Sequence, residues 1–202
     1  MTNRTARVYG VDENTMFMVF LKGSSDAFSY FYTFFINDLY AYGIGLGGSE
    51  DIVKDAIQDI FIKIHSNNQK EFSSIEHLKF FLLKSLKNKL YNIYTSKVVS
   101  MASPITEEAL EFSISTTVLD TIINEEDRII IQQKIDNLLT KLTARQKEAI
   151  YLRFIQELEY AEIAEILNMT QHGARKLISR SLKRLRGEEQ LLLIYLLKHF
   201  CS

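Results

Sequence analysis

The chain has 202 residues, a formal net charge of −1 and 47% hydrophobic residues, so it can form one or two globular domains with a sizeable core. Eight glycines, one proline and the lack of a sustained strand-like alternation of apolar and polar residues favour an all-α fold. The single cysteine excludes an intramolecular disulfide and a thiolate metal cluster, while the absence of a signal segment or a bilayer-length apolar run predicts a cytoplasmic protein without membrane insertion.

Residues 1–97 are predicted to form a compact helical domain. Ser24 or Ser25 is a suitable N-cap for a long helix whose aromatic-rich face is most simply core. Glycines between residues 43 and 48 then break the chain. They do not have the context of a phosphate-binding loop, because no strand precedes them and no Lys-Ser or Lys-Thr follows.

Two further helices are predicted in this domain. Ser49 caps the second helix, and a capping box from Ser73 to Glu76 starts the third, which runs to about Tyr94. On the second helix, several residues lie off the apolar stripe or at its edge: Asp55, Gln58, Asp59, Phe61 and Ile62. On the third helix, leucines face inward and the following lysines face outward: Lys79, Lys84, Lys87 and Lys89.

The segment 98–127 differs from its surroundings in composition. It contains seven acidic residues, no basic residue and the only proline, Pro104, which is typical of a tether. Residues 128–202 are predicted to form a second helical domain, in which Thr143 and Gln146 make a capping box. The expected architecture is therefore two small helical domains joined by an acidic linker.

Residues 160–186 have the pattern of a helix-turn-helix. A short amphipathic helix is followed by Asn168, which tolerates the left-handed conformation of a sharp helix end, and by Thr170, a good N-cap for the next helix. The second helix carries six basic residues and no acidic one: Arg175, Lys176, Arg180, Lys183, Arg184 and Arg186. In a chain of net charge −1, this local bias favours contact with a DNA major groove over a merely solvated face.

Three segments in this order resemble the bacterial sigma factors of the extracytoplasmic-function (ECF) group. Residues 142–186 are similar to the domain that reads the promoter −35 element, DAIQDIFIKI at 55–64 to the helix that binds core RNA polymerase, and residues 77–94, with Lys-Asn-Lys at 87–89, to the helix that meets the −10 element. The acidic linker lies at the expected place, and the resemblance covers nearly the whole chain. It departs from the family at His172-Gly173-Ala174, where Gly-Thr-Val is usual, and in lacking a typical Trp.

The resemblance implies a non-enzymatic protein that binds core RNA polymerase and promoter DNA. Residues 1–97 would be the region 2-like domain, 98–127 the linker and 128–202 the region 4-like domain. The polymerase contacts would be Asp55, Gln58, Asp59, Phe61 and Ile62, although Phe61 and Ile62 are each equally compatible with ordinary core. The −10 contacts would be Lys84, Lys87, Asn88 and Lys89, and the −35 contacts Arg175, Lys176, Ser179, Arg180, Lys183 and Arg184. An anti-sigma factor is a further expected partner.

Catalytic, metal and cofactor sites are not expected. The four histidines are scattered without a metal-binding or triad spacing, and no serine lies in a nucleophile elbow. Two other classes stay open: a conventional helix-turn-helix regulator that binds an operator as a dimer, and an interaction protein whose basic helix is only solvated. The role of the apolar run 191–197 is also open, between packing on the chain's own helices and masking of the basic helix.

Overall fold

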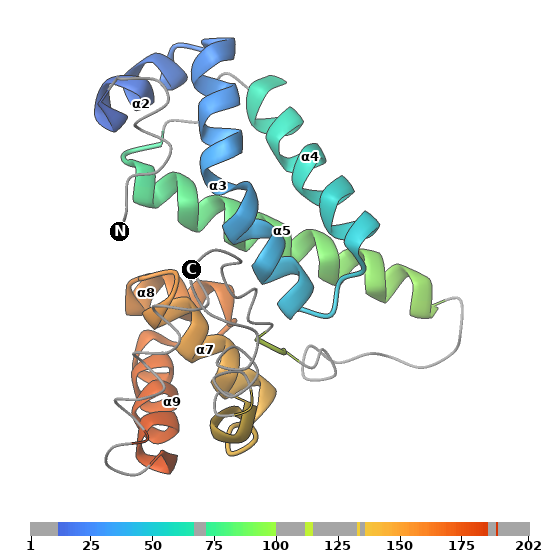
Figure 1. The fold of residues 1–202 in the computed structure, drawn as a ribbon, viewed down its shortest axis with the longest axis vertical. Helices are drawn as coiled ribbons and strands as arrows, with labels where there is room; N and C mark the ends of the chain where they lie inside the picture. The colour runs from blue at the N-terminus through green and yellow to red at the C-terminus, as the bar shows by residue number, and fades with distance from the viewer. Residues whose placement is uncertain are drawn as a thin grey trace. The chain divides into compact units, whose positions relative to one another are not determined.

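The computed structural model describes residues 12–66, 72–99, 112–114, 133, 136–185 and 189. All helices and strands assigned within these ranges are α-helices, which confirms the predicted all-α class (Figure 1). The chain divides into two compact units at Ile93 and Tyr94, with residues 44–47 grouped with the second unit. Within the described ranges, no helix has both the length and the apolarity needed to cross a membrane. Most of the predicted tether 98–127 and all of the apolar run 191–197 lie outside the described residues.

The first unit contains helices α2 (Glu13–Leu21) and α4 (Glu50–Ser66), together with α3 (Ser25–Gly45) up to Gly43 and α5 (Ile75–Val99) up to Ile93. Helix α2 was not predicted; Asp12 caps it by accepting a hydrogen bond from the Thr15 N–H at 3.3 Å. Ser24, of the two predicted serines, precedes α3, and its Oγ accepts a hydrogen bond from the Ala27 N–H at 3.4 Å. Each cap satisfies a backbone donor that the first helical turn leaves free.

Helix α5 begins differently from the prediction. Ser74, rather than Ser73, caps the helix, since its Oγ accepts a hydrogen bond from the His77 N–H at 3.1 Å. The Nδ1 atom of the His77 ring accepts a hydrogen bond from the Ser73 N–H at 3.3 Å. The helix then continues to Val99 instead of ending near Tyr94, because no glycine or proline interrupts it.

Aromatic and aliphatic side chains fill the core of this unit, as the sequence predicts for the face of α3. The largest fully buried side chains come from three helices: Tyr30, Phe31, Phe35, Leu39 and Tyr42 of α3, Ile57 and Phe61 of α4, and Leu78, Leu82, Leu83, Leu86 and Leu90 of α5. Removing a large side chain of this kind from water contributes about 1.5–3 kcal/mol of stability. The three long helices are therefore held by a shared apolar core.

Glycines allow the close approach of α3 and α4. A Cβ at Gly43 would lie 2.6 Å from Cγ1 of Val53, and a Cβ at Gly48 would lie 2.3 Å from Cγ2 of the same valine. The prediction that the chain breaks from Gly43 onward is wrong: helix α3 runs through Gly43 and Gly45, and the chain turns only after it, with Gly47 at a φ of 83°. The glycines thus serve packing and turning.

The second unit contains α7 (Ala144–Phe154), α8 (Tyr160–Ile166) and α9 (Gln171–Arg184), and each of these helices contacts the other two (Figure 1). The predicted capping box at the start of α7 is confirmed. The Gln146 N–H donates to Thr143 Oγ1 at 3.3 Å, and the Thr143 N–H donates to Gln146 Oε1 at 3.1 Å. This start fixes the helix against which the helix-turn-helix packs.

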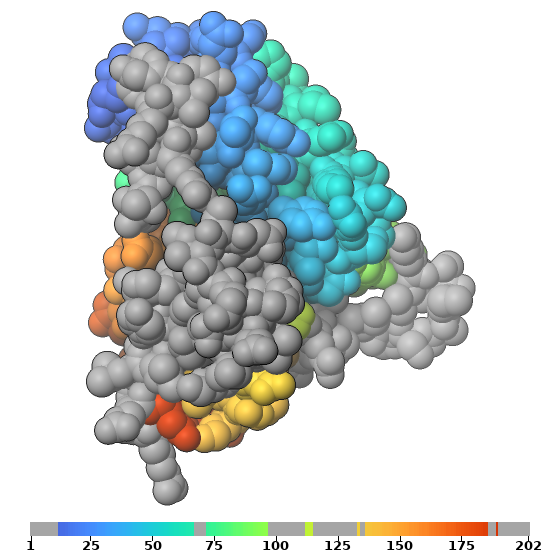
Figure 2. Space-filling model, in the orientation of Figure 1, coloured from blue at the N-terminus to red at the C-terminus, as the bar shows by residue number. Residues whose placement is uncertain are grey.

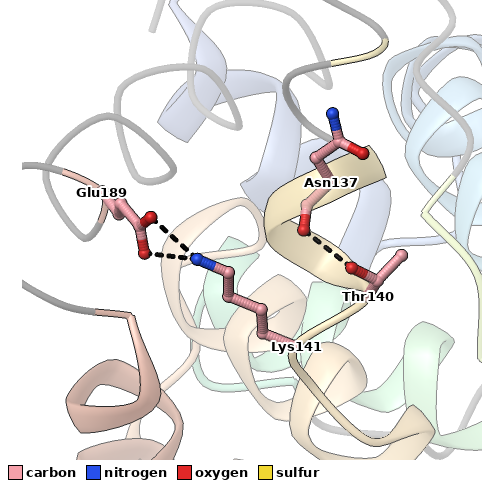
Figure 3. Close-up of polar contacts among 4 residues, drawn as sticks. All are labelled: Asn137, Thr140, Lys141 and Glu189. Carbon is pink, nitrogen blue, oxygen red and sulfur yellow. Dashed lines mark hydrogen bonds and ion pairs between the residues drawn. The ribbon is translucent and has the colours of Figure 1, made fainter.

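Replacing Thr143 with alanine is expected to lower the free energy of unfolding by about 1 kcal/mol, because the Gln146 N–H loses its acceptor. Thr140→Ala is the matched control: the Thr140 hydroxyl donates to the exposed carbonyl of Asn137 at 2.7 Å, which water can replace (Figure 3). The control is expected to change stability by less than about 0.5 kcal/mol. The free energy of unfolding is measured by urea denaturation. Equal decreases of this free energy in the two variants would contradict the capping role.

Candidate nucleic-acid interface

The turn between α8 and α9 is held by three independent features. Asn168 adopts a left-handed φ of 48°, as predicted. Thr170 caps α9, with its Oγ1 accepting from the Gly173 N–H at 3.1 Å. From α7, an Arg145 guanidinium nitrogen donates to the Leu167 carbonyl at 2.7 Å, which satisfies an acceptor at the end of α8. The orientation of α9 relative to α7 and α8 is therefore well determined.

Helix α9 has one buried and one basic face. Ala174, Ile178 and Ser181 are buried, and the Ser181 hydroxyl donates to the Leu177 carbonyl at 2.7 Å, so it needs no other partner. All six residues predicted to contact the −35 element are exposed: Arg175, Lys176, Ser179, Arg180, Lys183 and Arg184. Within one helix, residues spaced by three or four positions share a face, so this arrangement suits docking in a major groove. Their contact with DNA stays a prediction.

Gln171 and His172, which were not predicted as site residues, belong to the same exposed surface. Both are exposed and lie one helical turn before Arg175 and Lys176. The first residues of a recognition helix contact base edges in helix-turn-helix proteins, so these two are candidates by position. The same i, i+4 spacing that grouped the basic residues could have identified them. Gly173 leaves little room for a side chain, since a Cβ on it would lie 3.2 Å from Thr170 Oγ1, the atom that caps the helix.

The C-terminal end of α9 lies beside the loop that precedes α7. An Arg184 guanidinium nitrogen is 3.4 Å from the Lys141 carbonyl oxygen. The Lys141 ammonium contacts both carboxylate oxygens of Glu189 at 2.7 Å (Figure 3). The charge of Lys141 is thus compensated within the chain, whereas the arginines and lysines of α9 face no carboxylate among the described residues.

The solvent face of α4 forms the second candidate surface. Asp55, Gln58 and Asp59 are exposed, and Ile62 beside them is 61% exposed, the highest value among the large hydrophobic residues that the structure describes as exposed. Single exposed apolar side chains are common on protein surfaces, so Ile62 by itself does not mark an interface. The composition of this face agrees with a polymerase contact, a role that stays a prediction.

Phe61 does not belong to that surface, and the prediction that it is exposed is wrong. It is 1% exposed, and its ring packs edge-on against Phe28 and Tyr32 of α3, with centroid distances of 5.6 and 5.0 Å. Val53 and Ile57 are buried as well, so α4 buries a face wider than the single predicted stripe. The alternative interpretation of Phe61, ordinary core, is the correct one.

The four candidate −10 residues of α5 differ in exposure. Asn88 is exposed and Lys84 half-buried, with its ammonium 5.4 Å from the centre of the Phe80 ring. Lys87 is only 7% exposed, so the prediction that it faces outward is wrong. Lys89 is half-buried and forms an ion pair with Asp59 of α4. The hydrogen bond from Lys89 and its charge lower the pKa of Asp59.

The ion pair joins residues that the sequence assigned to different surfaces: Asp59 to the polymerase and Lys89 to DNA. In this structure the two side chains bind each other. Of the four −10 candidates, only Asn88 is fully exposed.

Among the described residues, no cluster of three histidine, cysteine, aspartate or glutamate side chains could hold a metal ion.

Comparisons with known proteins point to one kind of protein. The family described as Sigma-70, region 4 matches residues 132–185. The chain is 26% identical over 148 residues to the RNA polymerase sigma factor YlaC of Bacillus subtilis (strain 168), an alignment that covers 70% of this chain and 83% of the relative. It is 18% identical over 161 residues to the ECF RNA polymerase sigma factor SigM of the same organism, which covers 77% of this chain and 91% of the relative.

Proposed function

We propose that this chain, a sigma factor of the ECF type, binds core RNA polymerase and directs promoter-specific initiation of transcription. The observation that carries the proposal is the basic face of α9, presented by a helix-turn-helix that lies within the matched region 4 segment. A fixed, exposed row of cations on the second helix of such a pair is suited to phosphates and base edges of a major groove.

Each of the two units has its own role in this proposal. Helix α9 reads the −35 element, with Arg175 and Lys176 on base edges and Lys183 and Arg184 on phosphates. In the first unit, Asp55, Gln58 and Ile62 of α4 meet the polymerase, and α5 approaches the −10 element through Asn88 and Lys84. Asp59 and Lys89 enter either contact only when their mutual ion pair opens.

The chain needs no catalytic group for this function, because the polymerase carries the chemistry of RNA synthesis. The protein supplies recognition and would act in the cytoplasm, where polymerase and promoters meet. An anti-sigma factor is a further proposed partner, which rests on the resemblance to the ECF group alone.

Transcription in vitro with core polymerase on genomic fragments tests the proposal. The expected result is a set of discrete transcripts that require both the chain and the core enzyme, and whose start sites share a common upstream sequence. The purified chain alone is expected to shift the same fragments weakly, since the polymerase supplies most of the phosphate contacts. Tight binding of DNA by a dimer of the chain, without any effect on core polymerase, would support a conventional regulator instead.

A further inference from the structure

One aromatic ring links all three helices of the second unit. Tyr160 is the first residue of α8 and is half-buried. The guanidinium carbon of Arg153, from α7, lies 4.7 Å from the centre of its ring, and that of Arg175, from α9, lies 5.3 Å from it. Both distances are within the roughly 6 Å at which a cation is attracted to the face of an aromatic ring.

The two arginines differ in how they are held. Arg153 donates a hydrogen bond to the Leu158 carbonyl at 2.7 Å and lies 3.3 Å from a carboxylate oxygen of Glu159. Arg175 is exposed, and among the described residues the Tyr160 ring is the group that its guanidinium contacts. Arg153 is therefore anchored by the loop before α8, whereas Arg175 depends on Tyr160 for its orientation.

We infer that Tyr160 is a positioning residue that orients the Arg175 guanidinium for reading a base in the −35 element. The inference rests on the proposed function, in which Arg175 contacts a base edge. A long arginine side chain loses rotamer freedom when it binds a base, and a contact that already restricts it lowers this cost. Bidentate recognition of a guanine depends on the angle of the planar guanidinium, so its orientation affects which base is preferred.

Substitution of the ring tests this role through base preference. The full chain, assembled with core polymerase, selects promoters from a library randomised in the −35 element, and the preference at each position is measured by sequencing. Tyr160→Leu keeps an apolar side chain but removes the ring face, and it is expected to lower the preference at one position about 2- to 5-fold, the size of an exposed cation–π contact. Tyr160→Phe keeps the ring and should stay within about twofold of the original chain.

Two further variants separate orientation of Arg175 from simple packing. In an Arg175→Ala background, Tyr160→Leu should cause no additional loss of preference at that position, because the side chain to be oriented is gone. Pentafluorophenylalanine introduced at position 160 keeps the shape of the phenylalanine ring but reverses the charge distribution on its face, so it should behave like Tyr160→Leu. This variant also covers the case in which Tyr160→Leu fails to fold.

The inference is overturned if the fluorinated ring supports the same preference as phenylalanine, or if Tyr160→Leu has an equal effect with and without Arg175. Failure of the proposed function looks different, since the original chain would then give no polymerase-dependent transcripts at all. In that case the order of the Arg175 side chain, measured by NMR relaxation of its Nε–H group in the Phe and pentafluorophenylalanine proteins, still decides whether Tyr160 holds it. Unchanged order between these two proteins would overturn the positioning role.

Discussion

Replacing Arg175 with alanine is expected to relax the base preference at a single position of the −35 element and to weaken binding to the preferred promoter by about 1–3 kcal/mol. The reason is geometric: Arg175 is exposed near the start of α9, where a recognition helix meets base edges, and its guanidinium can donate two hydrogen bonds to one guanine. Competition between promoter variants, measured with the chain bound to core polymerase, gives the preference at each position. Lys176→Ala is expected to relax an adjacent position in the same way.

Lys183→Ala is the matched control for this prediction. It removes one positive charge from the same exposed face, two turns further along α9, where we expect contact with phosphate only. It should therefore weaken all promoter variants by the same factor and leave the preferences unchanged. If Arg175→Ala and Lys176→Ala also weaken all sequences alike, the assignment of base-reading positions on α9 is wrong.

Replacing Ile62 with glutamate is expected to reduce the affinity for core polymerase at least tenfold. Ile62 is 61% exposed between the polar residues of α4, and burial of such a side chain at an interface contributes about 1.5–3 kcal/mol. A glutamate there would lose this contribution and would leave a charge to be buried. The affinity is measured by titrating labelled chain with core enzyme, and circular dichroism melting of the same protein shows whether the fold is intact.

Met18→Glu provides the control on a different helix. Met18 of α2 is 56% exposed, so the substitution changes the same kind of surface without touching α4. It should leave polymerase affinity unchanged, and both variants should melt within a few degrees of the original chain.

Asp55→Lys is a useful second probe of the α4 face. Charge reversal at Asp59 is not, because it also breaks the ion pair with Lys89 and so disturbs α5. Full polymerase affinity in Ile62→Glu would rule out this face as the contact.

The features that could be predicted from the sequence are those determined by a few neighbouring residues. The capping box of Thr143 and Gln146, the left-handed Asn168 and the cap at Thr170 each depend on bonds within one turn of chain, and each is present as predicted. The exposed side of α9 was also predicted correctly, because a strongly basic face beside a small apolar one leaves a single way to pack.

Two of the errors concern residues whose environment is set by other helices. Phe61 and Lys87 each lie beside the predicted core stripe of their helix, and periodicity within one helix does not show how wide a face its neighbours cover. The choice of Ser74 over the adjacent Ser73 as a cap depended on the ring of His77, which takes the Ser73 N–H. The assignment of residues 1–97 as a region 2-like domain remains a prediction, as do the roles of the individual site residues.

The distribution of ion pairs has a consequence for how the chain would respond to ionic strength. Lys54, Lys89 and Lys141 are each paired with a carboxylate of the chain itself, whereas Arg175, Lys176, Arg180 and Lys183 of α9 face none among the described residues. The cations of this second group can displace counterions from DNA, and each phosphate that they neutralise adds about 0.9 to the slope of log affinity against log salt concentration. A chain of net charge −1 can therefore bind DNA with a strong salt dependence, to which the exposed cations of α9 contribute.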